Sequence, residues 1–238
     1  RILVTEMLNL SQYIDLMIPR GGKDLVEMVN REAKMPSITG GVGVCHAYVD
    51  ESATLDMAVE VVFNSKVQRP SVCNALDTIL VHASSAPKFL PLMANAFAEV
   101  GVEMRCDTRS LSILGSRDDV KIETAVSSDW DTERLSLTVG VKVVDSISDA
   151  LERIDRHGTG HTDAIITESD SAGDTFLQTV DSSAVMLNAS TRFNDGGEFG
   201  LGAEVAVSTN KLHARGPMGL RELTSYKWLV LGKGHIRS

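Results

Sequence analysis

Residues 79–105, ILVHASSAPKFLPLMANAFAEVGVEMR, decide the fold of this chain. The first four of these residues form a short apolar run that predicts a strand, and residues 86–100 have the spacing of a helix. Residues 102–105 then predict a second strand. Because a helix between two strands is typical of parallel pairing, the stretch favours an α/β fold.

The alternation of strands and helices continues on both sides of this stretch. Towards the N-terminus the sequence predicts a strand at 13–19, a helix at 24–32, strand residues within 37–49 and an amphipathic helix at 52–63. Towards the C-terminus it predicts strands at 137–144, 163–167, 184–188 and 226–231, helices at 148–157 and 174–180, and a helical turn at 220–224. Residues 1–10 have helical spacing but no capping residue before them, so we expect the chain to begin inside a helix of a longer protein.

Composition excludes several classes of protein. The chain has 238 residues, 43% of them hydrophobic and 23% charged, which is typical of a soluble globular protein of one or two domains. No apolar run is long enough to span a membrane, and a net charge of −9 argues against broad binding to nucleic acid. Cys45, Cys73 and Cys106 show no CxxC spacing, which favours a reduced, cytoplasmic protein over a disulfide scaffold or a structural metal site.

Cys73 is the candidate nucleophile. It lies in RPSVCNALDT, residues 69–78, where Arg69 can favour the thiolate and the backbone N–H of Asn74 can stabilise a developing oxyanion. A thiolate also leaves well from a thioester, which suits acyl transfer. The alternative is that Cys73 is a small buried hydrophobic residue at the start of a strand. Cys45 lies in a strand run and is predicted to be core, and no role is predicted for Cys106.

A candidate anion site lies near the N-terminus. Arg20, Gly21, Gly22 and Lys23 follow a predicted strand and precede a predicted helix. The glycines would let backbone N–H groups approach a phosphate at the helix N-terminus, and Lys23 would add a positive charge. The alternative is a tight connection without a ligand.

A second candidate anion site follows the predicted strand 184–188. Arg192 offers a forked donor for a carboxylate or phosphate, and backbone N–H groups around Ser190 and Thr191 can do the same. The alternative is that Arg192 only satisfies carbonyl groups of its own loop. The surrounding run 180–220 is rich in glycine and has little helix or strand periodicity in its first half.

Two further polar features have weaker patterns. His157 and His161 have i, i+4 spacing, but glycines between them break the helix that a shared metal would need, so no metal site is predicted. Glu133 could accept hydrogen bonds from a ribose, although a solvated surface carboxylate is the commoner outcome.

Long stretches of this chain closely resemble the glutamate-5-semialdehyde dehydrogenases, also called gamma-glutamyl phosphate reductases, of the aldehyde dehydrogenase superfamily. The resemblance covers essentially the whole chain, as the C-terminal part of such an enzyme. It is carried by YIDLMIPRGGKDLV at 13–26, VCHAYVDESATLDMA at 44–58, NSKVQRPSVCNALDTILVH at 64–82, HGTGHTDAIIT at 157–167 and the run 180–220.

The resemblance implies a domain plan. Residues 1–72 would be the remaining part of a Rossmann-like NADP-binding domain, residues 73–196 an α/β catalytic domain, and residues 197–238 an oligomerisation tail. It also implies a homo-oligomer, with glutamate 5-kinase as a candidate partner that supplies the substrate.

The resemblance further implies a reaction in proline biosynthesis. Cys73 would attack L-glutamyl 5-phosphate, release phosphate and form a thioester, which hydride from NADPH would convert to L-glutamate 5-semialdehyde. Arg20, Gly21, Gly22 and Lys23 would lie by the pyrophosphate of the cofactor and Glu133 by a ribose. Ser190, Thr191 and Arg192 would hold the amino-acid end of the substrate.

One absence favours a phosphate-using enzyme over a hydrolytic one. Hydrolytic aldehyde dehydrogenases carry a glutamate base in the strand before the cysteine, whereas residues 37–44 here contain no carboxylate. Two alternatives stay open, namely another acylating aldehyde dehydrogenase that uses a donor such as coenzyme A, and an inactive structural fragment.

Overall fold

The computed structural model describes residues 2–238, apart from the side chain of Lys23. Its centre is a seven-stranded sheet in the order β4-β3-β5-β2-β1-β6-β7, in which every neighbouring pair is parallel. The predicted α/β fold is therefore confirmed. The strands are β1 (His46–Val49), β2 (Thr78–His82), β3 (Glu103–Cys106), β4 (Ile122–Thr124), β5 (Thr138–Val144), β6 (Thr162–Ile166) and β7 (Ala184–Leu187).

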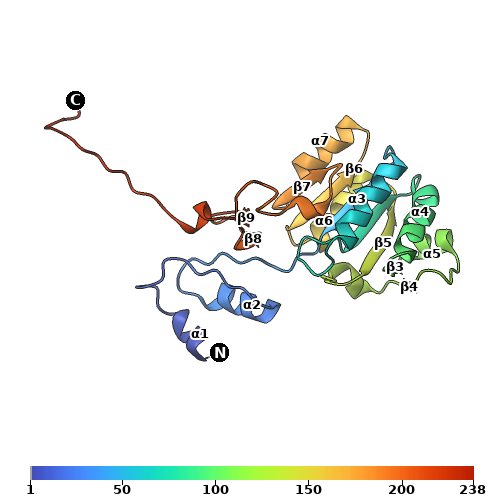
Figure 1. The fold of residues 1–238 in the computed structure, drawn as a ribbon, viewed down its shortest axis with the longest axis horizontal. Helices are drawn as coiled ribbons and strands as arrows, with labels where there is room; N and C mark the ends of the chain where they lie inside the picture. Colours follow the sequence, from blue (N-terminus) through green and yellow to red (C-terminus); the bar gives the residue numbers. More distant parts are fainter. Residues whose placement is uncertain (1) are drawn as a thin grey trace.

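Both faces of the sheet are covered by helices, as Figure 1 shows. Side chains alternate between the faces: in β2, Ile79 and Val81 join one core cluster while Leu80 joins the other. The first cluster packs against α3 (Leu55–Val67), α4 (Ala86–Ala98) and α5 (Thr108–Leu114), and the second against α6 (Ile147–His157) and α7 (Asp170–Thr179). A sheet buried on both sides explains why its inner strands read as continuous apolar runs.

Side-chain caps fix where several of the helices begin. Asp107 accepts a hydrogen bond from the backbone N–H of Ser110 at 2.8 Å, and Ser146 accepts one from Asp149 at 3.1 Å. Each cap satisfies an N–H group that has no partner within the helix. The sequence pattern had not predicted α5, which contains only seven residues.

A smaller layer lies beside the main sheet. It contains α1 (Ile2–Met7), α2 (Lys23–Glu32) and an antiparallel hairpin of β8 (Ala206–Ser208) and β9 (Gly216–Met218). Ile38 packs between Ala206 and Met218 in a small buried cluster, so the N-terminal segment and the hairpin share one core. Residues 37–45 then lead directly into β1.

The predicted strand at residues 13–19 is wrong. This segment forms only one isolated bridge. In it the Met17 N–H donates to the Pro36 carbonyl oxygen at 2.9 Å, and the Ile38 N–H donates to the Met17 carbonyl oxygen at 2.9 Å. A strand needs a neighbour along its whole length, and an apolar run does not reveal whether one exists.

The predicted strand at residues 226–231 is also wrong. After a single turn, η3 (Arg221–Leu223), the chain runs on as an extended arm that points away from both layers (Figure 1). Tyr226, Trp228 and Leu231 are 84%, 85% and 97% exposed. The role of this arm in oligomerisation stays a prediction.

One strand of the sheet and one of its helices precede Cys73 in the chain. β1 and α3 both precede Cys73, and β1 is hydrogen-bonded between β2 and β6 in the middle of the sheet. A unit that started at residue 73 would lack this strand, and the domain boundaries after residues 72 and 196 stay predictions. Within residues 2–238, no helix is long and apolar enough to cross a membrane.

Candidate active site

A pocket of about 1040 Å³ opens at the amino ends of the central strands. Because the strands are parallel, the segments that enter them meet along one edge of the sheet. The wall is formed by residues that precede β1, β2, β5 and β6, by the start of α2 and by the glycine-rich segment after β7. Of the predicted site residues, the pocket brings together Arg20, Gly21, Gly22, Cys73, Asn74, Glu133 and Arg192.

Cys73 lies half-buried in the pocket wall, on the turn before β2. Burial raises the pKa of the Cys73 thiol, and the negative charges of Glu133 and Glu204 raise this pKa further. The positive charge of Arg20 opposes them. Burial and the two carboxylates therefore oppose formation of the thiolate, which is the reactive form of the thiol.

Asn74 lines the pocket, and its side chain holds the turn against the segment after β7. The Asn74 Nδ2 donates to the carbonyl oxygen of Asn194 at 3.0 Å. Within the described part of the chain, the Asn74 backbone N–H donates no hydrogen bond to another residue. An unpaired N–H next to the sulfur is the group that the predicted oxyanion site requires.

The segment that precedes β1 contacts the carbonyl group of Cys73. The Cys45 Sγ donates to this oxygen at 3.2 Å, and Gly43 lies so close that an added Cβ would be 2.1 Å from it. Cys45 is fully buried, as predicted, and burial raises the pKa of its thiol. Cys45 therefore supports the turn that carries Cys73 and is not exposed to substrate.

Asp77, which the sequence interpretation did not identify, joins three segments of the site. Its carboxylate accepts the backbone N–H of Cys45 at 3.1 Å and that of Arg134 at 2.7 Å. Burial raises the pKa of Asp77 to about 6, and burial lowers the pKa of the nearby Lys66 to about 8. The Lys66 Nζ donates to the Leu76 carbonyl oxygen at 2.7 Å. The end of the turn is therefore held at Leu76 by a buried cation and at Asp77 by a buried carboxylate.

Glu133 reaches the pocket from the segment before β5. One of its carboxylate oxygens accepts the Gly43 N–H at 3.0 Å, and burial raises the pKa of Glu133. The residues at 37–44 contain no carboxylate of their own, but the fold brings Glu133 to them from another part of the chain. Its role at a cofactor ribose stays a prediction.

We expect a Glu133→Gln substitution to lower the pKa of Cys73. Glutamine keeps an oxygen for the Gly43 N–H but removes a negative charge that disfavours the thiolate. The rate of Cys73 alkylation by iodoacetamide, measured against pH, should therefore rise at a lower pH than in the wild type. An unchanged or higher apparent pKa would contradict this electrostatic coupling, and a Glu198→Gln variant, changed on the exposed surface, is the control.

The predicted phosphate site lies at the start of α2. Gly22 is the N-cap of this ten-residue helix and makes no side-chain cap to its first N–H groups. Arg20, Gly21 and Gly22 all line the pocket. The side chain of Lys23 lies outside the described part of the chain.

The predicted substrate site at residues 190–192 is only partly open to the pocket. Arg192 lines it, but Ser190 and Thr191 are buried against α3, where Ser65 Oγ accepts the Thr191 N–H at 3.2 Å. Ser190 Oγ accepts the Arg192 N–H at 3.2 Å. These two N–H groups are therefore occupied, and Arg192 is left as the donor that faces the pocket.

Asp195 and Glu204 also line the pocket, although the sequence interpretation did not identify them. Both lie in the glycine-rich run, where an acidic residue has no pattern that distinguishes a pocket position from a surface position. The charges of both carboxylates act on the Arg192 guanidinium, so they lie near it in the pocket wall.

The two histidines lie in different surroundings. His157 pairs with Asp131 at 2.7 Å at the end of α6, whereas His161 is buried 3.9 Å from the Cys45 Sγ. Burial lowers the pKa of His161 to about 4. In the portion of the chain that the structure describes, no three His, Cys, Asp or Glu side chains are grouped so that they could hold a metal ion.

Comparison with known proteins identifies relatives along the whole chain, although no model of a protein family matches it. The gamma-glutamyl phosphate reductase of Dehalococcoides mccartyi is 52% identical over 237 residues, which are 100% of this chain and 56% of that protein. The crystal structure of gamma-glutamyl phosphate reductase from Thermotoga maritima superposes with a TM-score of 0.92 at 47% identity, again over 100% of this chain and 56% of the other. The chain thus spans a little over half the length of these relatives.

A more distant structure shows how widely the fold is shared. An acetylating aldehyde dehydrogenase from Geobacillus thermoglucosidasius superposes with a TM-score of 0.74 at 18% identity, over 98% of this chain and 60% of that one. At this identity the likeness concerns the fold alone. Taken with the closer relatives, it shows that this chain is a homologue of gamma-glutamyl phosphate reductases and is built on the aldehyde dehydrogenase fold.

Proposed function

We propose that the protein containing this chain reduces L-glutamyl 5-phosphate to L-glutamate 5-semialdehyde and phosphate, through a thioester on Cys73. The observation that carries the proposal is the position of Cys73. Cys73 lines one pocket together with Asn74, whose N–H donates to no described residue, and with the start of α2 and Arg192. The choice of substrate is supported by the sequence identity to gamma-glutamyl phosphate reductases, which is 52% for one relative and 47% for another.

The pocket has groups that suit a dinucleotide. A helix N-terminus without a side-chain cap, flanked by Arg20, is suited to a pyrophosphate, and Glu133 has a carboxylate oxygen that could accept a ribose hydroxyl. We propose NADPH, which when bound supplies the hydride that reduces the thioester. On this view Arg20, Gly21 and Gly22 hold the phosphates and Glu133 orients the sugar.

The residues of the chain account for the acyl-transfer steps. The Cys73 thiolate attacks the acyl carbon, a C–S bond forms, and the C–O bond to phosphate breaks so that phosphate leaves with both electrons. The Asn74 N–H stabilises the negative charge that develops on the acyl oxygen. After reduction, the thiohemiacetal loses Cys73 as the leaving group, which regenerates the thiol and releases the aldehyde.

The reverse reaction tests the proposal. NADP and glutamate 5-semialdehyde should yield NADPH only when phosphate is present, in the full reading frame that encodes this chain. Phosphate is required because it must attack the acyl carbon to release Cys73. Turnover that does not depend on phosphate would exclude this reaction and favour hydrolysis of the thioester. Turnover that requires coenzyme A would favour another acylating aldehyde dehydrogenase. The absence of any turnover would favour a structural role.

A further inference from the structure

Charges of both signs face each other on one side of the pocket. Arg69 and Arg192 lie in its wall with Asp195 and Glu204, close to Cys73. Burial lowers the pKa of the Arg192 guanidinium, while the charges of Asp195 and Glu204 raise it and that of Arg69 lowers it further, so all four groups interact through space. A site with separate cations and anions is suited to a ligand that carries both.

Arg192 and Glu204 do not neutralise each other. The Arg192 Nε donates to Gln68 Oε1 at 2.9 Å, and none of the side chains that the structure describes forms an ion pair with Glu204. Glu204 Oε2 accepts the backbone N–H of Gly196 at 2.9 Å, which fixes the carboxylate by one oxygen and leaves the other for a ligand. The charged groups of Arg192 and Glu204 are therefore close to each other, but each is fixed by a different hydrogen-bond partner.

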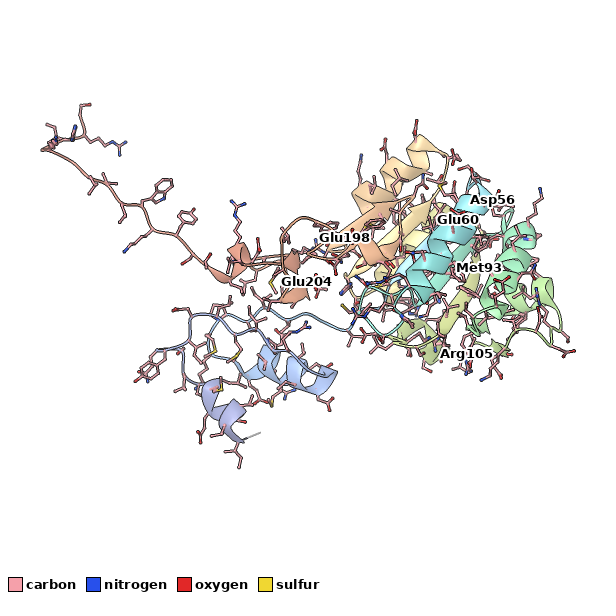
Figure 2. The ribbon with its side chains drawn as sticks, in the orientation of Figure 1. Asp56, Glu60, Met93, Arg105, Glu198 and Glu204 are labelled. Carbon is pink, nitrogen blue, oxygen red and sulfur yellow. The ribbon has the colours of Figure 1, made fainter. Side chains whose placement is uncertain are left out.

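The backbone fixes Glu204 at this position. A Cβ added to Gly196 would lie 2.9 Å from the Glu204 Cβ and 3.0 Å from the Ala203 oxygen, so only glycine lets the two segments approach this closely. Leu201 N–H donates to the Gly196 oxygen at 2.8 Å and closes the loop between them. Figure 2 shows Glu204 and Glu198 on the segment that leads from the sheet towards β8.

We propose that Glu204 binds the α-ammonium group of an amino-acid substrate whose α-carboxylate is held by Arg192. The proposal rests on the proposed function and names a specificity-determining residue for it. An amino acid carries its two charges on groups attached to one carbon, and a forked guanidinium beside a carboxylate matches both. The glutamyl side chain would then extend from this pair to place its acyl carbon at Cys73.

Glu204 is a better acceptor than Asp195. Asp195 Oδ1 already accepts two backbone N–H groups, from Gly197 at 2.8 Å and Glu198 at 3.3 Å, which stabilise the turn that contains it. Glu204 accepts only one, and its longer side chain brings its charge close enough to influence Cys73. Asp195 is thus assigned to the structure of the loop and Glu204 to the ligand.

The test compares two aldehydes in the full reading frame, one with the ammonium group and one without. Phosphate-dependent oxidation of L-glutamate 5-semialdehyde and of 5-oxopentanoate is measured in the wild type and in Glu204→Gln. Glutamine still accepts the Gly196 N–H but carries no charge. In Glu204→Gln we expect kcat/KM for L-glutamate 5-semialdehyde to fall about 10-fold, mainly through a higher KM. The effect is limited to this size because Glu204 is exposed, and solvent weakens its interaction with a charged ligand group. For 5-oxopentanoate kcat/KM should change by less than about 2-fold.

A binding measurement and a matched control complete the design. L-Glutamate should protect Cys73 from iodoacetamide better than glutarate does in the wild type, and this preference should disappear in Glu204→Gln. Glu198→Gln, which removes an exposed carboxylate of the same segment, should keep it. Equal loss with both aldehydes in Glu204→Gln, or no wild-type preference between them, would overturn the assignment of Glu204 alone. No phosphate-dependent turnover of either aldehyde by the wild type would overturn the proposed function and this assignment with it.

Discussion

Replacement of Cys73 by serine is expected to lower phosphate-dependent turnover by at least about 10³-fold in the full reading frame. Serine fits the same space, and its backbone can still follow the turn that Cys45 and Gly43 support. Its hydroxyl ionises far less readily than a thiol, and an oxygen ester lacks the reactivity of a thioester towards hydride. The measurement is the rate of NADPH formation from glutamate 5-semialdehyde, NADP and phosphate.

A second cysteine serves as the matched control. Cys106 is fully buried in β3, which β5 separates from the strand that follows Cys73. Cys106→Ala should keep turnover within about 3-fold of the wild type, because it removes one buried sulfur outside the pocket, although it will lower the melting temperature slightly. Retention of phosphate-dependent turnover in Cys73→Ser, with folding intact by circular dichroism, would show that Cys73 is not the nucleophile.

The sheet could be predicted from sequence because its strands are buried on both faces. A run such as Ile79-Leu80-Val81 has no polar alternation, and a strand covered on both sides needs none. The failures at residues 13–19 and 226–231 have a common cause. Both segments are apolar, but whether an apolar segment becomes a strand depends on a partner that its own residues do not specify.

The pocket residues divide in the same way. Cys73, Arg20 and Arg192 were candidates because each carries its own chemistry, and the parallel sheet brings the segments around them together. Asp77 and Glu204 were not candidates because their roles come from contacts across the fold. Asp77 joins Cys45 to Arg134, and nothing in the local sequence around Asp77 specifies either partner.

Gly43→Ala should have the largest effect on the folded structure of the site. The new Cβ would lie 2.1 Å from the Cys73 carbonyl oxygen and 3.0 Å from its carbonyl carbon, which are backbone atoms that cannot rotate away. Relief requires the turn before β2 to move, which would weaken the Cys45 contact with Cys73 and the Gly43 hydrogen bond to Glu133. Overpacking of this kind costs about 1–3 kcal/mol or more, so we expect a melting temperature lower by several degrees.

The same movement should change the chemistry at Cys73, because the carbonyl group displaced belongs to the nucleophile itself. Gly41→Ala is the matched control, since a Cβ there meets only Thr209 Oγ1 at an ordinary 3.5 Å. It should melt within about 2 °C of the wild type, a shift that corresponds to at most about 0.5–1 kcal/mol for a chain of this size. In Gly43→Ala the rate of Cys73 alkylation should change together with the loss of stability, and in Gly41→Ala neither should. If both alanine variants melt alike and alkylate alike, the close approach of Gly43 to Cys73 does not hold the turn, and the position of the nucleophile must depend on Asp77 and Lys66 instead.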